Sequence, residues 1–223
     1  IQPVREVADL CRSRGASLHT DAVQAVGHVA VSVREVPCDL LAMSAHKFGG
    51  PKGVGALYIR RGTELAPLLH GGGQERGIRA GTSNVAGAVG LAEALERSAE
   101  ERSRDPHRLQ GLRDRLEERL RAGAAGLLVH GAGAERLPHV LNVGVSDVEP
   151  DVLLASLDLA GLAVSSGSAC HSGATSPSHV LLAMGASPDA AIRFSLGWPT
   201  TDQDIDRASA TFLEVLERAR AAI

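Results

Sequence analysis

The chain has 223 residues, of which 44% are hydrophobic and 22% charged, and its formal net charge at pH 7 is −3. This balance is typical of a globular protein with a packed core. The 2% aromatic content and the lack of a basic stripe argue against nucleic-acid binding. No apolar run approaches the roughly 20 residues of a membrane span. Three widely spaced cysteines argue against a disulfide scaffold and favour a reducing cytoplasm.

The first half of the chain is predicted to alternate between helices and short strands. Proline near the first turn and Gly15 at the end mark the first helix, and glycines and prolines bound the strands. The predicted helices are Pro3–Arg14, Val85–Arg102 and His107–Arg121, and the predicted strands are Ala16–Thr20, Asp39–Ser44 and Val54–Arg60. Ser103–Pro106 is a polar break between two helices, so we expect one domain over 1–104 and a second over 105–223.

The second half continues the alternation. Predicted strands are Val140–Val145, Leu162–Ser165 and Ala191–Leu196, and predicted helices are Asp151–Leu159, Pro177–Met184 and Thr201–Ala222. Thr201 and Asp204 have the spacing of a capping pair at the start of the closing helix. Such alternation predicts an α/β or α+β architecture.

Lys47 is the first candidate for catalysis. The chain holds 21 arginines but only two lysines, Lys47 and Lys52, so a retained lysine is suspected of work that arginine cannot do. A lysine amine can lose its proton and attack a carbonyl, whereas arginine stays charged. Lys47 follows an apolar strand and precedes a glycine-rich turn, where catalytic side chains are often found. The alternative is an exposed lysine in a turn.

Ser44, His46 and Asp21 are further candidates, and each stands at or just after a predicted strand end. Ser44 and His46 can bind a phosphate beside Lys47. Asp21 follows an apolar strand, where ligands meet open α/β sheets, and a carboxylate there can hold a pyridinium nitrogen protonated. Asp21 is equally well explained as a helix N-cap.

Two loops carry the remaining candidates. In His70–Thr82, glycines free the backbone to approach an anion and Arg76, Arg79 and Thr82 can contact it, although a flexible loop explains the glycines as well. In Ser165–Gly173, small residues leave Cys170 accessible and His171 can help to form its thiolate, the alternative being an incidental surface cysteine.

Arg193 lies inside an apolar strand, where an arginine needs an anionic partner. A substrate carboxylate and a structural salt bridge both fit this position. Cys11 and Cys38 lie in apolar contexts and are predicted to be inert core residues. No metal-ligand set is singled out.

Together the motifs resemble the pyridoxal-phosphate-dependent cysteine desulfurases of the NifS/IscS type, along the whole chain. They are HTDAVQ, SAHKFGGPKGVGALY, HGGGQERGIRAGT, SSGSACHSG and IRFSLG, and the SSGSAC form resembles the IscS-like group. The resemblance implies the fold type I (aspartate aminotransferase-like) of pyridoxal-phosphate enzymes. Residues 1–104 are then the C-terminal part of the large cofactor-binding domain with its mixed sheet, and 105–223 a small α+β domain with the catalytic cysteine loop.

The resemblance also implies residue roles. Lys47 forms the internal aldimine and moves protons, Asp21 pairs with the pyridinium nitrogen, and Gln24 bonds the phenolic oxygen. Ser44 and His46 bind the phosphate, and Thr82 reaches the phosphate site of the other subunit of a homodimer. Arg193 binds the carboxylate of L-cysteine, and Cys170 accepts its sulfur as a persulfide, releasing alanine.

The implied setting is cytoplasmic sulfur transfer to an acceptor protein such as an iron–sulfur scaffold, for iron–sulfur cluster biogenesis or another thio-modification. Alternatives are a selenocysteine lyase or another class V aminotransferase-like enzyme, and a truncated, non-catalytic interaction protein. The family's earlier segment, with its phosphate loop and ring-stacking histidine, is not found in this sequence, so we expect the chain to be the later portion of a longer protein.

Overall fold

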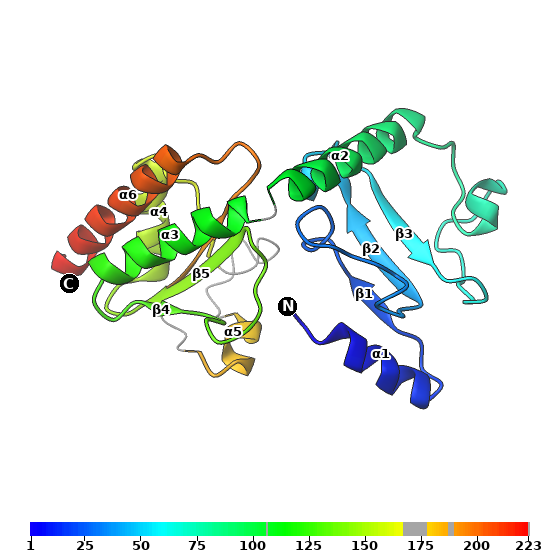
Figure 1. Cartoon of the computed structure of the whole chain (residues 1–223), viewed down its shortest axis with the longest axis horizontal. Coiled ribbons are helices and arrows are strands. Elements are labelled where there is room, and N and C mark those ends of the chain that lie inside the picture. Colours follow the sequence, from blue (N-terminus) through cyan, green and yellow to red (C-terminus); the bar gives the residue numbers. More distant parts are fainter. Residues whose placement is uncertain (106, 167–177, 187–189, 223) are drawn as a thin grey trace. The chain divides into compact units, whose positions relative to one another are not determined.

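The computed structural model describes residues 1–105, 107–166, 178–186 and 190–222 (Figure 1). It divides into two compact units. The first unit is Gln2–Pro106, and the second is His107–Ile223 together with Ile1. Each unit is described by itself below. No helix in the described part of the chain is both long and apolar enough to cross a bilayer.

The first unit holds a three-stranded mixed sheet in the order β1-β2-β3. Its elements are α1 (Val4–Ser13), β1 (His19–Asp21), β2 (Leu40–Ser44), the 3₁₀ turn η1 (Ala45–Phe48), β3 (Gly55–Ile59), the 3₁₀ turn η2 (Gln74–Gly77) and α2 (Val85–Arg104). β1 runs parallel to β2, and β3 runs antiparallel to β2. Because parallel strands end at the same edge, the end of β1 lies beside the end of β2.

The core of the first unit is built mainly from small residues. Phe48 and Leu41 are its largest aliphatic or aromatic side chains, and they pack with Ala22, Val26, Cys38, Ala45 and Ala94. The burial of Cys38 confirms its prediction as a core residue, whereas Cys11 on α1 is only half-buried.

The second unit is an antiparallel sheet covered by helices on one face. The strands are β4 (Leu128–Val129), β5 (Val140–Val145) and β6 (Ala190–Ser195), and the helices are α3 (Arg108–Gly123), α4 (Pro150–Leu159), α5 (His179–Ala183) and α6 (Asp202–Ala221). α3, α4 and α6 pack on the sheet face that carries Leu141, Val143 and Phe194 (Figure 1). The rings of Phe194 and Phe212 meet edge to face with centroids 5.5 Å apart.

Most predicted elements are confirmed, with shifted ends. The predicted strand Leu162–Ser165 is wrong as a strand: only Ser165 pairs, in an isolated bridge to Arg193. The chain turns at Gly161, whose φ is +79°, and over residues 162–166 its backbone then reaches hydrogen-bonding distance of β6 only at Ser165, which bonds to Arg193. The first strand begins at His19 rather than Ala16. β4 was not predicted, because a strand of two residues is too short to show an alternation of apolar and polar side chains.

The predicted capping pair of the closing helix is confirmed. The Thr201 hydroxyl oxygen accepts from the Asp204 N–H at 3.2 Å, and a carboxylate oxygen of Asp204 accepts from the Thr201 N–H at 2.8 Å. Together these bonds form a capping box. The bonds from Thr201 lower the pKa of the Asp204 carboxyl below its usual value.

Candidate active site

Lys47 lies in the short turn that continues β2. β2 ends at Ser44 in extended conformation, the η1 turn follows over Ala45–Phe48, and Gly49 ends the turn in the left-handed region at φ 86°. Gly50 packs so closely that an added Cβ would stand 2.9 Å from the Cβ of Ala45. The turn is therefore tightly seated on the core, and the half-buried Lys47 starts from a fixed backbone.

Ser44 and His46 form a hydrogen-bonded pair beside Lys47. The Ser44 hydroxyl lies 2.8 Å from Nδ1 of His46, and the imidazole is exposed. In the tautomer in which the hydroxyl donates to Nδ1, the proton of the ring is on Nε2. That N–H is then available to an anion, which suits the phosphate-binding role predicted from the sequence.

Asp21 closes β1, next to the end of β2 in the parallel pair. One carboxylate oxygen accepts from the backbone N–H of Val23 at 2.9 Å, and the side chain is exposed. Residues 23–28 form turns rather than a helix, so the N-cap explanation of Asp21 is wrong. The second oxygen has no hydrogen bond within the described part of the chain. Gln24 lies exposed in the same run of turns.

His28, which no motif singled out, contacts the backbone of Lys47. Its Nε2 lies 3.0 Å from the Lys47 carbonyl oxygen. Burial lowers the pKa of His28 below its usual value, and the hydrogen bond to Lys47 opposes that shift without overcoming it. The ring is therefore neutral at neutral pH. Sequence reading had no signal for it, since a lone histidine after a glycine has no diagnostic spacing.

The glycine-rich loop of residues 70–82 holds itself together. The side-chain oxygen of Gln74 accepts from the Gly81 N–H at 3.2 Å, and Arg79 donates to the Ala80 carbonyl at 2.9 Å. Thr82 is exposed. Within the described residues, no hydrogen bond or ion pair joins Thr82 to Ser44, His46 or Lys47. Its predicted role toward a second subunit stays a prediction.

Arg193 lies on β6 in the second unit, opposite Asn142 of β5. Residues alternate along a strand, so Arg193 and Asn142 lie on the sheet face away from the helices that cover Phe194. The Nε of Arg193 is buried without a hydrogen-bond partner, and no carboxylate in the described part of the chain pairs with its guanidinium. This observation weakens the structural salt bridge as an explanation of Arg193 and favours an anionic ligand.

Asn142 in turn contacts a histidine that sequence reading also missed. Nδ1 of His130 lies 2.5 Å from the side-chain oxygen of Asn142, next to β4. Gly144 makes room for this ring, because an added Cβ there would stand 2.9 Å from Nε2 of His130. Cys170 and His171 lie outside the described residues, so the accessibility of Cys170 stays a prediction.

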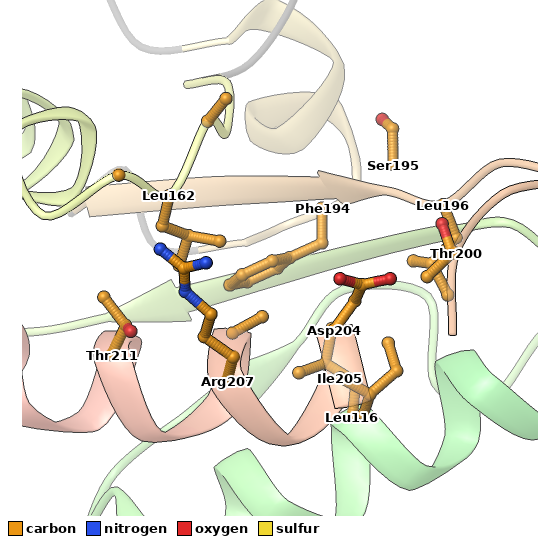
Figure 2. A pocket seen from close by; sticks show the side chains of 13 residues that line it. Leu116, Leu162, Phe194, Ser195, Leu196, Thr200, Asp204, Ile205, Arg207 and Thr211 are labelled. Atoms are coloured by element: carbon orange, nitrogen blue, oxygen red, sulfur yellow. The ribbon is translucent and has the colours of Figure 1, made fainter. Parts of the chain in front are cut away.

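A pocket of about 190 Å³ lies between β6 and α6, and it holds none of the predicted site residues. Figure 2 shows Asp204, Ile205 and Arg207 on α6, Phe194 on the strand facing them, and Leu116 beside Ile205. Asp204 is committed to the capping box, and Arg193 is not among the residues that line the pocket. We therefore assign it no part in the chemistry. No cluster of metal-ligating side chains occurs among the described residues.

This chain is similar to known proteins along nearly its whole length. The model of the family described as "Aminotransferase class-V" matches residues 1–208. Cysteine desulfurase IscS of Clostridium botulinum is 43% identical over 225 residues, which cover 99% of this chain and 57% of that protein. A cysteine desulfurase of Klebsiella pneumoniae is 46% identical over 222 residues, covering 98% of this chain and 56% of that protein.

The solved structures extend the likeness to the fold. The NifS-like protein of Rickettsia africae superposes with a TM-score of 0.88 at 27% identity, covering 97% of this chain and 58% of that one. This likeness confirms the predicted α/β fold of the NifS/IscS type. The chain spans little more than half the length of the relatives that it matches. It belongs to the class-V aminotransferase family.

Proposed function

We propose that the protein containing this chain is a pyridoxal-phosphate-dependent cysteine desulfurase, which removes sulfur from L-cysteine and leaves alanine. The observation that carries the proposal is the placement of Lys47 on a closely packed turn at the end of β2, with Ser44 and His46 beside it and Asp21 at the neighbouring strand end. The names of the relatives, which are cysteine desulfurases, support the same reaction.

The donor set fits pyridoxal phosphate. The Asp21 carboxylate oxygen that accepts no hydrogen bond from the described residues suits a protonated ring nitrogen, and the exposed amide of Gln24 suits a phenolic oxygen. The Ser44–His46 pair offers donors to a phosphate, and the Lys47 amine can bond to an aldehyde carbon. When bound, the cofactor supplies an electron sink for bonds at the substrate α-carbon. Thr82 is assigned to the phosphate site of the partner in a homodimer.

The substrate is handled by the remaining residues. Arg193, whose Nε has no partner in the described part of the chain, binds the carboxylate of L-cysteine. Lys47 carries protons to and from the substrate as a general base and acid. The Cys170 thiolate forms a bond to the substrate sulfur as the carbon–sulfur bond breaks, which leaves a persulfide on Cys170 and releases alanine after protonation. An acceptor protein, such as an iron–sulfur scaffold in the cytoplasm, then takes the sulfur.

Borohydride trapping tests the assignment of Lys47. The full-length protein is incubated with pyridoxal phosphate, reduced, digested and mapped by mass spectrometry. We expect a pyridoxyl label on Lys47 and none on Lys52, the chain's other lysine. Lys47→Arg should lose the label and all activity, whereas Lys52→Arg should keep both. An unlabelled wild-type protein would instead support a non-catalytic interaction protein.

Cys170→Ser separates a desulfurase from other members of the family. Only a reaction that needs a nucleophilic thiol should fail in this variant. We expect the variant to take up cofactor normally and to release no sulfide from L-cysteine. Full sulfide release would overturn the role of Cys170, and a wild-type preference for L-selenocysteine over L-cysteine would favour a selenocysteine lyase.

A further inference from the structure

The turn that carries Lys47 ends in two backbone carbonyls that receive side-chain donors. His28 donates from Nε2 to the Lys47 carbonyl at 3.0 Å. The Ser98 hydroxyl lies 3.2 Å from the Phe48 carbonyl and 2.8 Å from the Ala94 carbonyl of its own helix, so its one proton is shared between these two acceptors. A carbonyl oxygen only accepts, so the proton of the His28 ring is on Nε2. The last carbonyls of a helical turn lack partners within that turn; His28 supplies one, and Ser98 supplies the other in part.

One face of α2 supports this arrangement. Ala94, Ser98 and Arg102 are four residues apart and therefore lie on the same side of the helix. The Cβ of Ala94 is 3.2 Å from where a Cβ on Gly50 would stand, and Arg102 donates to the Gly27 carbonyl at 3.5 Å. The same helix face thus contacts both the Lys47 turn and the turn that ends in His28.

The turn before His28 also packs directly on the Lys47 turn. Gly27 has φ +87°, and an added Cβ would stand 2.4 Å from the Cβ of Phe48. The backbone of Gly27 therefore touches the residue that follows Lys47. His28 is half-buried, and burial keeps its ring neutral with one proton to donate. The ring therefore extends from a closely packed turn, and its hydrogen-bond acceptor is the Lys47 carbonyl.

We infer that His28 is a positioning residue for Lys47, with Ser98 as a weaker second donor that the turn shares with the Ala94 carbonyl. His28 holds the backbone carbonyl of Lys47 in place. It thereby fixes the backbone position from which the flexible Lys47 side chain brings its amine to a carbonyl carbon or to a substrate α-proton. Misplacing a reacting group by about 1 Å can cost up to about 100-fold in rate. The inference rests on the proposed function of Lys47 and adds a residue that belongs to no motif.

The test compares His28→Phe, which keeps a flat side chain but removes the donor, with His28→Gln, whose amide can donate from a similar place. The matched control is Arg60→Met in the same unit. Arg60 donates to the Cys38 carbonyl at 2.7 and 3.0 Å, so this variant also removes a side-chain bond to a backbone carbonyl, but away from Lys47. All variants are made in the full-length holoenzyme.

We expect His28→Phe to lower kcat about tenfold with an unchanged KM for L-cysteine. His28→Gln should restore kcat to within about threefold of wild type, and Arg60→Met should leave it unchanged. The second readout is the rate at which the apoenzyme takes up pyridoxal phosphate covalently at Lys47, followed by borohydride trapping; it should fall in His28→Phe and recover in His28→Gln.

Ser98→Ala keeps the inference testable if His28→Phe does not fold, and it should slow both readouts by a smaller factor. A wild-type kcat in His28→Phe, equal losses in Arg60→Met, or no recovery in His28→Gln would each overturn the inference. A wild-type protein without label or activity would instead reject the proposed function.

Discussion

The two units differ in how their cores are built. The second unit buries long aliphatic and aromatic side chains between one sheet and three helices, with Leu116, Leu141, Ile192 and Phe212 almost inaccessible. The first unit buries a smaller set around Phe48 that includes three alanines, and its backbones approach closely at Gly27 and Gly50. The second core therefore gains most from apolar burial, whereas the first depends on close fit and on hydrogen bonds to backbone carbonyls.

Large apolar side chains are exposed in both units; in the second unit, Leu159 is 88% and Val152 56% exposed. Leu57 on β3 is 45% exposed, and Val85 and Val89 on α2 are 67% and 64% exposed. The matching relatives are nearly twice as long as this chain. We infer from the smaller core that the unit carrying Lys47 has less stability of its own than the unit carrying Arg193.

Separating the units should produce the largest effect. Expressed alone, residues 107–223 should unfold cooperatively with heat, because their core is complete within the unit. Residues 2–106 alone should show no cooperative transition. Circular dichroism melting and dispersion of amide resonances measure both. A cooperative transition in the first unit alone would remove the contrast.

Among single substitutions in the core, Phe212→Ala should cause the largest loss in the free energy of unfolding. Phe212 is fully buried and stacks edge to face on Phe194, so its truncation should lower the free energy of unfolding by about 4 kcal/mol. Denaturant unfolding of residues 107–223 measures this loss. Leu159→Ala in the same unit is the control: Leu159 is 88% exposed, so a change within about 0.5 kcal/mol is expected. Equal losses would contradict the described core.

Gly27→Ala tests the close fit of the first unit. The substitution adds left-handed strain and a clash with Phe48, so a loss of about 3 kcal/mol is expected in denaturant unfolding of the full-length protein. Gly53→Ala is the matched control. Gly53 has a similar φ of +79° but open space at its Cβ, and its loss should be about 1 kcal/mol. Equal losses would show that strain alone matters.

Removing a helix N-cap should lower the free energy of unfolding by the same amount in both units, whereas the cores of the two units differ. Thr201 caps α6 in the second unit, and Asn84 caps α2 in the first by accepting from the Gly87 N–H at 2.9 Å. Thr201→Ala and Asn84→Ala should each lower the free energy of unfolding by about 1 kcal/mol. Thermal melting measures both, and a loss several times larger at Asn84 would show that the cap also holds the Lys47 region.

The smallest expected effect is a pH dependence from His28. Its pKa is lowered in the folded protein, so the unfolded state binds a proton first as the pH falls. His28 should therefore contribute stability that is fully present above pH 6.5 or so and is lost below it. Wild type should lose stability more steeply than His28→Gln between about pH 6.5 and 5 in urea titrations. If the free energy of unfolding fell equally with pH in wild type and in His28→Gln, that result would contradict a buried, neutral His28.

Much of the fold could be read from the sequence, because glycine, proline and hydrophobic periodicity mark element ends locally. The helix from Thr201 and the strands around Lys47 and Arg193 were predicted on that basis. The bridge at Ser165 could not be separated from a full strand, since pairing length depends on the partner strand. Asp21 required the structure too, because one aspartate after a strand can begin a helix or a turn.

What the sequence determined by itself was the set of candidate residues: the rare lysine, its serine and histidine neighbours, and the loop cysteine are singled out by residue type and local spacing. Only the tertiary structure decided which groups hold Lys47 in place. His28 and Ser98 reach the turn from positions 19 and 50 residues away in sequence from their acceptors. Such contacts leave no local pattern, because they depend on chain segments meeting in space, and that meeting is fixed by close packing at Gly27 and Gly50.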